Sequence, residues 1–269
     1  MRFSICNETF QGWDWERTCA FVAECGYGGV EVAPFTLAAD VRELEPARRR
    51  HIREVAEVHG LQVCALHWLL VSPEGLSLTT PDPVVRTATS AYLVALADLA
   101  GDLGAGIMVL GSPRQRWIAE GDDPRAARSR FIEALRPALD HAERREVRIC
   151  LEPLPPPEAN FLLTLDEAEG LLRELRHPAA CTIFDVKSAS AEGQPLDALL
   201  LTHIANVGHI HANDANRRGP GFGATDFRPI LRAAQDCGYD GWVSVEVFDY
   251  SPSPEAIATE SLRYLTSCL

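Results

Sequence analysis

The chain has 269 residues, 46% of them hydrophobic, and its 25 basic against 38 acidic side chains give a net charge of −13 at pH 7. Such a charge repels phosphate backbones and anionic lipid, so it argues against nucleic-acid or membrane-surface partners. The sequence has no apolar run of 18 residues, and its first segment lacks the basic and apolar regions of a signal peptide. We therefore expect a cytoplasmic globular protein.

Short apolar runs alternate with longer amphipathic stretches along the chain. The runs predict strands at residues 2–6, 29–32, 62–70, 106–110, 147–151, 181–184, 209–212 and 242–247. The amphipathic stretches predict helices at residues 14–24, 45–59, 83–103, 123–145 and 194–206, and helices that begin after Thr164, Asp226 and Ser253. The predicted strands have few alternating polar positions, which is typical of a parallel sheet covered on both faces.

The number of these units indicates the architecture. Eight strand–helix pairs in 269 residues repeat about every 34 residues (269/8). This predicts a closed (β/α)8 TIM barrel that forms a single domain over residues 1–269. A doubly wound open sheet is the alternative, but no G-x-G-x-x-G sequence follows the first strand.

The eight cysteines include no C-x-x-C pair, and Cys6, Cys64, Cys150 and Cys181 lie inside apolar runs. A free cysteine in such a run behaves as a small buried hydrophobic residue. We therefore expect these four side chains to pack in the core rather than to bind metal.

Ionisable residues stand at the ends of four successive strands in the second half, at Glu152, Asp185, His211 and Glu246. In a parallel barrel these ends share one face, where active sites form. Three buried carboxylates would repel one another without a cation, although each residue alone would equally suit a salt bridge. The pattern predicts one divalent ion bound by all four residues, with Mn²⁺ favoured and Co²⁺ or Mg²⁺ as alternatives.

At these residues the chain resembles the sugar isomerase/epimerase superfamily of xylose-isomerase-like TIM barrels, and within it the ketose 3-epimerases of the tagatose and psicose type. The likeness covers nearly the whole chain and is strongest at Leu151-Glu152-Pro153-Leu154, Phe184-Asp185, His211-Ala212-Asn213-Asp214 and Ser244-Val245-Glu246. It implies that Glu152 and Glu246 are metal ligands and also acid–base groups. One would remove a proton beside the carbonyl of a small polyhydroxylated substrate, and the other would return a proton to the resulting cis-enediolate.

The resemblance also implies substrate contacts. Glu158 and Arg217 stand six residues after Glu152 and His211, where the epimerases keep a carboxylate and an arginine. The family uses an early strand-end histidine and a nearby aromatic residue to shape its pocket, which makes His67 and Trp68 candidates. Further candidates from the first and second halves are Asn7 and Lys187. His67 would equally suit a hydrogen bond in the core, and Lys187 could equally point outward.

Three other charged residues have more ordinary interpretations. Arg114 and Arg116 could clamp an anion, but exposed loop arginines are the commoner case. Glu31 lies in a Cys-Gly-Tyr-x-Gly segment that resembles residues 237–247, and its pattern slightly favours shared turn chemistry over a role in the site.

The sequence departs from the ketose 3-epimerases at two places. Ser188 stands where they usually have a substrate-binding histidine, and Pro155-Pro156-Pro157 replaces an Asn-Arg-aromatic stretch. A metal-dependent lyase or dehydratase acting on a cyclic or keto polyol is therefore an alternative, as is a non-enzymatic sugar-binding barrel. An abasic-site endonuclease shares the barrel, but the net charge opposes it. The resemblance further suggests a homo-oligomer.

Overall fold

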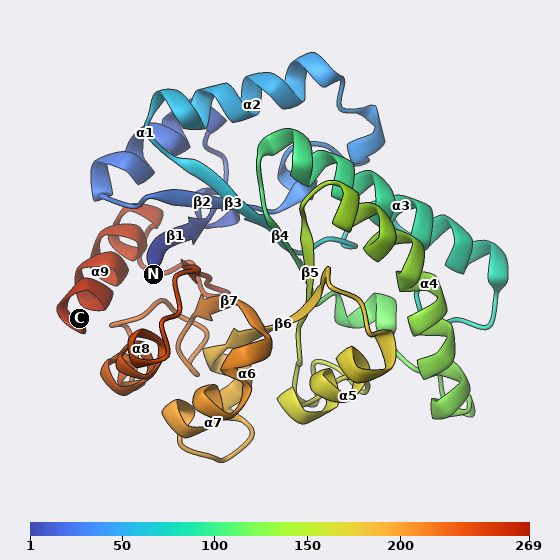
Figure 1. Ribbon diagram of the computed structural model, residues 1–269. Helices are drawn as coiled ribbons and strands as arrows, with labels where there is room; N and C mark the ends of the chain where they lie inside the picture. Colours follow the sequence, from blue (N-terminus) through green and yellow to red (C-terminus); the bar gives the residue numbers. More distant parts are fainter. The chain divides into compact units, whose positions relative to one another are not determined.

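The computed structural model describes residues 1–269 (Figure 1). Eight parallel strands follow one another in chain order around a closed barrel, and β8 pairs with β1. The strands are β1 (Arg2–Cys6), β2 (Gly29–Val32), β3 (Gln62–Leu66), β4 (Ile107–Leu110), β5 (Arg148–Leu151), β6 (Ala180–Asp185), β7 (Val207–Ala212) and β8 (Trp242–Val245). The predicted (β/α)8 barrel is therefore confirmed.

Helices follow the strands as the sequence predicts. They are α1 (Trp15–Cys25), α2 (Pro46–Val58), α3 (Pro83–Leu103), α4 (Pro124–Arg144), α5 (Leu165–Leu175), α6 (Val186–Ser190), α7 (Leu196–His203), α8 (Phe227–Asp236) and α9 (Pro254–Ser267). The hydroxyl of Thr164 accepts a hydrogen bond from the backbone N–H of Glu167, so it caps α5 as expected. The sequence did not predict α6, whose five residues are too few to show a helical period.

Three strands end at other residues than expected. β3 ends at Leu66 instead of residue 70, because Trp68 adopts a positive φ of 52° and turns the chain. β8 ends at Val245, so Glu246 lies directly after the strand instead of within it. β6 extends one residue further than expected and includes Asp185. These shifts place ionisable side chains where the strands give way to loops.

Backbone contacts divide the chain into two compact units. The first unit comprises residues Met1–Val32, His51–Cys64 and Ile183–Leu269, and the second comprises Ala33–Arg50 and Ala65–Thr182. Three of the four divisions fall inside α2, β3 and β6, so each of these elements belongs partly to either unit, and the fourth falls at the end of β2.

In the first unit the core lies between the strands and the helices that follow them. Tyr27 donates a hydrogen bond to the carbonyl of Ala258, which ties the end of α1 to α9. Gly29 passes under the ring of Trp242, and a Cβ at that position would lie 2.7 Å from the ring and 2.9 Å from the carbonyl oxygen of Gln62. Glycine at this strand position therefore permits the close packing of β2 against its neighbours.

In the second unit α3 and α4 lie side by side (Figure 1). The ring of Phe131 on α4 contacts that of Phe161 edge-on at 5.2 Å between centroids. The guanidinium of Arg145 forms an ion pair of 2.5 Å with Asp102, which also pairs with Arg49. The ion pair thus joins α3 to the end of α4, and Phe131 packs α4 against the segment that precedes α5.

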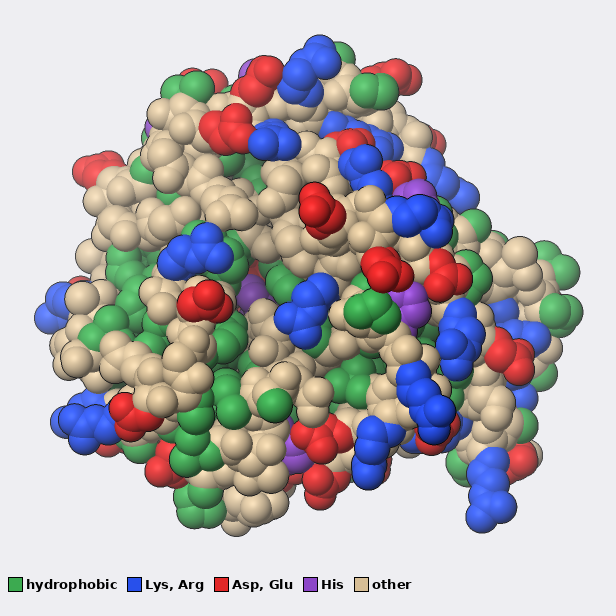
Figure 2. Space-filling view, viewed as in Figure 1, with side chains coloured by type: hydrophobic (Ala, Val, Ile, Leu, Met, Phe, Trp, Pro, Cys, Tyr) green, Lys and Arg blue, Asp and Glu red, His purple; other side chains and the backbone are tan.

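The four cysteines predicted to pack in the core are buried free thiols. None of the helices combines the length and the apolar character of a membrane-spanning segment. On the face drawn in Figure 2, acidic and basic side chains lie next to one another.

Candidate metal centre

Three of the four predicted metal ligands meet in the first unit. Asp185 ends β6, His211 lies in β7 and Glu246 follows β8, and these residues are 3%, 0% and 2% exposed. The Nδ1 atom of His211 lies 3.1 Å from Oε2 of Glu246 and 3.7 Å from Oδ2 of Asp185. One ligand atom from each residue lies within 4.8 Å of the others. The parallel strands therefore deliver two carboxylates and one imidazole to one point.

Asn213, two residues after His211, holds both carboxylates. Its Nδ2 atom donates hydrogen bonds to Oδ2 of Asp185 at 2.6 Å and to Oε2 of Glu246 at 3.1 Å. Its Oδ1 atom accepts a hydrogen bond from the backbone N–H of Lys187 at 2.9 Å. The backbone N–H of Ser188 donates to Oδ1 of Asp185 at 2.6 Å. The carboxylates are thus oriented before any ligand binds, and the sequence did not predict this role for Asn213.

The donor set fits a divalent cation. Two carboxylates buried this deeply repel each other, and a neighbouring positive charge offsets the free-energy cost of burying them. Burial alone would lower the pKa of His211, but the carboxylates of Glu246 and Glu31 raise that pKa well above its usual value. The site therefore attracts positive charge strongly, and oxygen donors with one ring nitrogen suit Mn²⁺, Co²⁺ or Mg²⁺.

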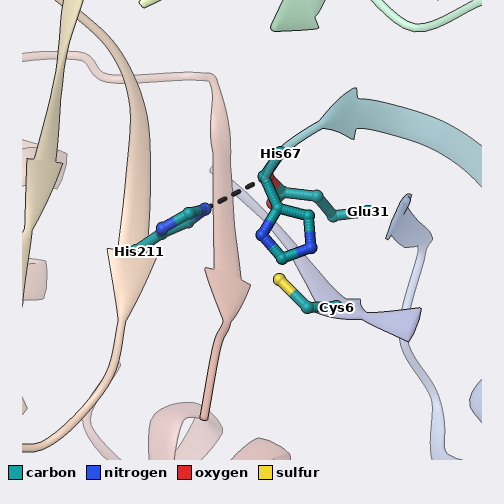
Figure 3. Close-up of side chains that lie close together, drawn as sticks. All are labelled: Cys6, Glu31, His67 and His211. Atoms are coloured by element: carbon teal, nitrogen blue, oxygen red, sulfur yellow. Dashed lines mark hydrogen bonds and ion pairs between the residues drawn. The ribbon is translucent and has the colours of Figure 1, made fainter. Parts of the chain in front are cut away.

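Glu31 on β2 contacts the far side of the His211 ring (Figure 3). Its Oε1 atom accepts a hydrogen bond from Nε2 of His211 at 3.1 Å, and its Oε2 atom accepts one from Nε2 of His209 at 2.8 Å. Burial would raise the pKa of Glu31, but the two imidazoles hold it well below its usual value. The slight preference for a turn role was therefore wrong, because Glu31 is fully buried within the strand. The sequence signal for this contact is the pair of histidines at alternate positions of β7, because side chains at alternate positions share one face of a strand.

Glu152, the fourth predicted ligand, lies in the second unit directly after β5 and is buried. Its backbone N–H donates to the carbonyl of Leu110 at 3.2 Å, and its own carbonyl accepts a hydrogen bond from Nη1 of Arg116 at 2.6 Å. A Cβ on Gly111 would collide with Oε2 of Glu152. The absence of a side chain at Gly111 therefore leaves the space that the Glu152 carboxylate fills.

Arg116 corrects an expectation. The side chain is 1% exposed instead of lying in solvent, because its guanidinium donates to the carbonyls of Glu152 and Leu162. Burial lowers the pKa of Arg116 to about 10, against the opposing effect of the Glu152 carboxylate. Arg114 is exposed, as expected.

Two predicted substrate-binding residues of the first unit lie against one aromatic ring. Nζ of Lys187, which is buried, lies 4.9 Å from the centroid of Phe248, and Cζ of the exposed Arg217 lies 5.5 Å from it. Arg217 has a positive φ of 71°, and its carbonyl accepts hydrogen bonds from the backbone N–H groups of Phe248 and Asp249. A third candidate of this unit, Asn7, is buried at the start of a short 3₁₀ turn after β1.

The remaining candidates belong to the second unit. His67 is fully buried, and its ring lies 6.4 Å from that of Trp68. Trp68 is half-buried and packs 5.8 Å from the ring of Phe35. Glu158 is exposed, and its backbone N–H donates to the carbonyl of Pro155. The substrate roles of these residues stay predictions.

Comparison with known proteins agrees with the fold and with the resemblance. The family model described as "Xylose isomerase-like TIM barrel" matches residues 19–268. A D-psicose 3-epimerase from Ruminiclostridium cellulolyticum is 24% identical over 87% of this chain and 80% of its own. A fructoselysine 3-epimerase from Escherichia coli O157:H7 is 21% identical over 92% of this chain and 90% of its own.

A solved structure has the same architecture over the entire chain. The crystal structure of a 3-keto-D-glucoside 4-epimerase from E. coli superposes with a TM-score of 0.85 at 19% identity, and covers 100% of both chains. Its likeness is one of fold. The family match over residues 19–268 shows that the chain belongs to the xylose isomerase-like TIM barrel family.

Proposed function

We propose that the protein is a divalent-metal-dependent sugar epimerase or isomerase, similar in its chemistry to the ketose 3-epimerases. The observation that carries the proposal is the convergence of Asp185, His211 and Glu246 at the ends of three neighbouring strands. The names of the relatives, D-psicose and fructoselysine 3-epimerase, support this reaction class at 21–24% identity.

The proposed ligands are these three residues and Glu152. Glu152 is included because it directly follows β5, the neighbour of β6 in the barrel order, and because it is buried. Its place at a strand end matches those of the other three, as the family resemblance implies. A bound divalent ion would withdraw electron density from the substrate oxygens and so acidify the adjacent C–H bond. Mn²⁺ is our first choice of ion.

The protein side chains would move the proton. We assign proton removal and return to the carboxylates of Glu246 and Glu152, one on each face of the substrate carbon. The amide of Asn213 holds the Glu246 oxygen in a fixed direction, which favours directed proton transfer. The substrate would contact Lys187, Arg217, Glu158, Asn7, His67 and Trp68.

Isotope exchange tests the proton transfer directly. Ketoses are incubated with Mn²⁺-loaded protein in D₂O, and proton NMR records deuterium at the carbon next to the carbonyl. We expect exchange by the wild-type protein and its loss in Glu246→Gln, because an amide cannot accept the proton. Thr202→Ala, an exposed change on α7, is the control and should exchange normally. Undiminished exchange in Glu246→Gln would contradict the assigned role.

The same incubation carried out in H₂O, followed by mass spectrometry, separates epimerisation from dehydration. An epimer keeps the mass of the substrate, whereas a dehydratase product is lighter by one water and gains ultraviolet absorbance from its conjugated carbonyl. We expect equal masses for substrate and product. A product that has lost water would replace the epimerase proposal with a lyase acting through the same carboxylates.

A further inference from the structure

We infer that Glu31 and His209 are positioning residues, which fix the ring of His211 so that its Nδ1 atom faces the metal. The inference rests on the metal site proposed above, and adds two residues that do not contact the ion. It begins from the direction of the His211 ring. Nδ1 faces the carboxylates of Glu246 and Asp185, whereas Nε2 faces Glu31.

The two sides of the ring require one tautomer. A neutral imidazole has one N–H donor and one lone pair. Because Glu31 offers only acceptor oxygens when ionised, the bond at 3.1 Å places the proton on Nε2 of His211. A divalent ion binds only the neutral ring, so when the ion displaces the other proton the lone pair lies on Nδ1, on the side of Glu246 and Asp185. A carboxylate behind a metal-binding histidine also makes the ring a more basic ligand.

His209 holds the carboxylate in this position. Its Nε2 atom donates to the second oxygen of Glu31 at 2.8 Å, and its ring stands at 80° to that of His211. The Nδ1 atom of His209 is buried and has no hydrogen-bond partner, so the polar contact of this side chain is the one with Glu31. With an oxygen bonded to each ring, the carboxylate cannot rotate without breaking a hydrogen bond.

The burial of these three residues makes the hydrogen bonds between them necessary. Glu31, His209 and His211 are each 0% exposed. An ionised carboxylate in such a place is costly unless both oxygens are hydrogen-bonded or paired with positive charge. The two histidines supply those bonds, and they connect β2 to β7 through the interior of the first unit. A rigid arrangement of this kind limits the freedom of the His211 ring.

Metal titration of Glu31→Gln tests the inference. Calorimetry measures Mn²⁺ binding to chelator-treated wild-type and variant proteins, whose folding is checked by circular dichroism. We expect affinity to fall about 10- to 100-fold in the variant, because glutamine carries no charge and can accept at one atom only. Cys64→Ala is the matched control, since Cys64 is also buried beside Glu31 but donates to the backbone of Val30. The control should bind within about twofold of wild type.

NMR of the imidazole rings measures the protonation of each ring nitrogen. A residue that only stabilised the fold would not alter this protonation. In Mg²⁺-loaded protein labelled with ¹⁵N-histidine, we expect a protonated Nε2 and an unprotonated Nδ1 for His211. Glu31→Gln should shift the Nε2 resonance and speed the exchange of its proton, and Cys64→Ala should not. His209→Phe keeps a ring but removes the donor, and should weaken Mn²⁺ binding less than Glu31→Gln does. This variant also serves if Glu31→Gln fails to fold.

The outcomes separate this inference from the proposed function. If wild-type protein binds Mn²⁺, but Glu31→Gln and His209→Phe bind it equally well with unchanged His211 signals, the positioning role is overturned and the metal site stands. If wild-type protein binds no divalent ion, the proposed metal site itself fails. A selective loss of affinity with altered His211 signals supports both.

Discussion

Gly111 is the residue through which the position of Glu152 can be tested without altering its carboxylate. A Cβ at Gly111 would collide with Oε2 of Glu152, so Gly111→Ala must displace that oxygen. Because a displacement of about 1 Å in a reacting group can cost roughly 100-fold in rate, we expect kcat/KM to fall by about that factor. Steady-state kinetics measure the fall, once a turned-over substrate is known.

Gly106→Ala is the control for this substitution. A Cβ there meets no atom within 4 Å, so the variant should keep its activity and its melting temperature. Full activity in Gly111→Ala would show that the exact place of the Glu152 carboxylate is irrelevant to turnover. That result would remove Glu152 from the proton-transfer role.

The sequence predicts only those residues of the candidate site whose own position in the chain marks them, and it does not predict contacts between distant residues. Asp185, His211 and Glu246 are predicted as ligands because each interrupts or ends an apolar run, and their convergence is a property of their positions at strand ends. The bond between Glu31 and His211 was not found, because it joins residues 180 positions apart. The burial of Arg116 could not be predicted for the same reason, since its acceptor, the carbonyl of Glu152, is 36 residues away.

At the scale of the element, helix ends follow local chemistry and are therefore predictable. Thr164 caps α5 as the sequence pattern predicts, whereas the carboxylate of Glu167 accepts a hydrogen bond from the N–H of Leu163, one residue before the position that the capping-box pattern implies. The end of β3 was missed because the apolar run continues to Leu70, while the turn at Trp68 depends on packing. The helix α6 was missed because Asp185 both ends β6 and caps that helix.

The cap at Thr164 leads to a measurable prediction. Thr164→Ala leaves the N–H of Glu167 without its acceptor, and we expect it to lower the free energy of unfolding by about 1 kcal/mol. Urea denaturation followed by circular dichroism gives that free energy. Thr164→Ser keeps the hydroxyl and should lose little stability. Equal stability of the alanine and serine variants would argue against the cap.

At the scale of the whole molecule, the eight-strand order could be predicted because each strand–helix pair repeats the same pattern. The division into two contact units could not, since three of its four boundaries lie inside α2, β3 and β6 rather than in linkers. A strand that both units share loses its pairing when either unit unfolds. We therefore expect residues 1–269 to behave as one domain.

Equilibrium unfolding tests this expectation. The fluorescence of the five tryptophans and the far-ultraviolet circular dichroism should give coincident urea transitions with one midpoint. Both signals should be recorded on the same metal-free protein, because a ligand would add stability of its own. Two separated transitions would show that the units unfold independently.

The most direct test of the account is the binding of Mn²⁺ to chelator-treated protein, measured by calorimetry. Asp185, His211 and Glu246 converge on one buried point, so we predict one ion per chain and the loss of its binding in His211→Ala. Wild-type protein that binds no Mn²⁺, Co²⁺ or Mg²⁺, or His211→Ala protein that binds as tightly as wild type, would contradict the proposed metal centre.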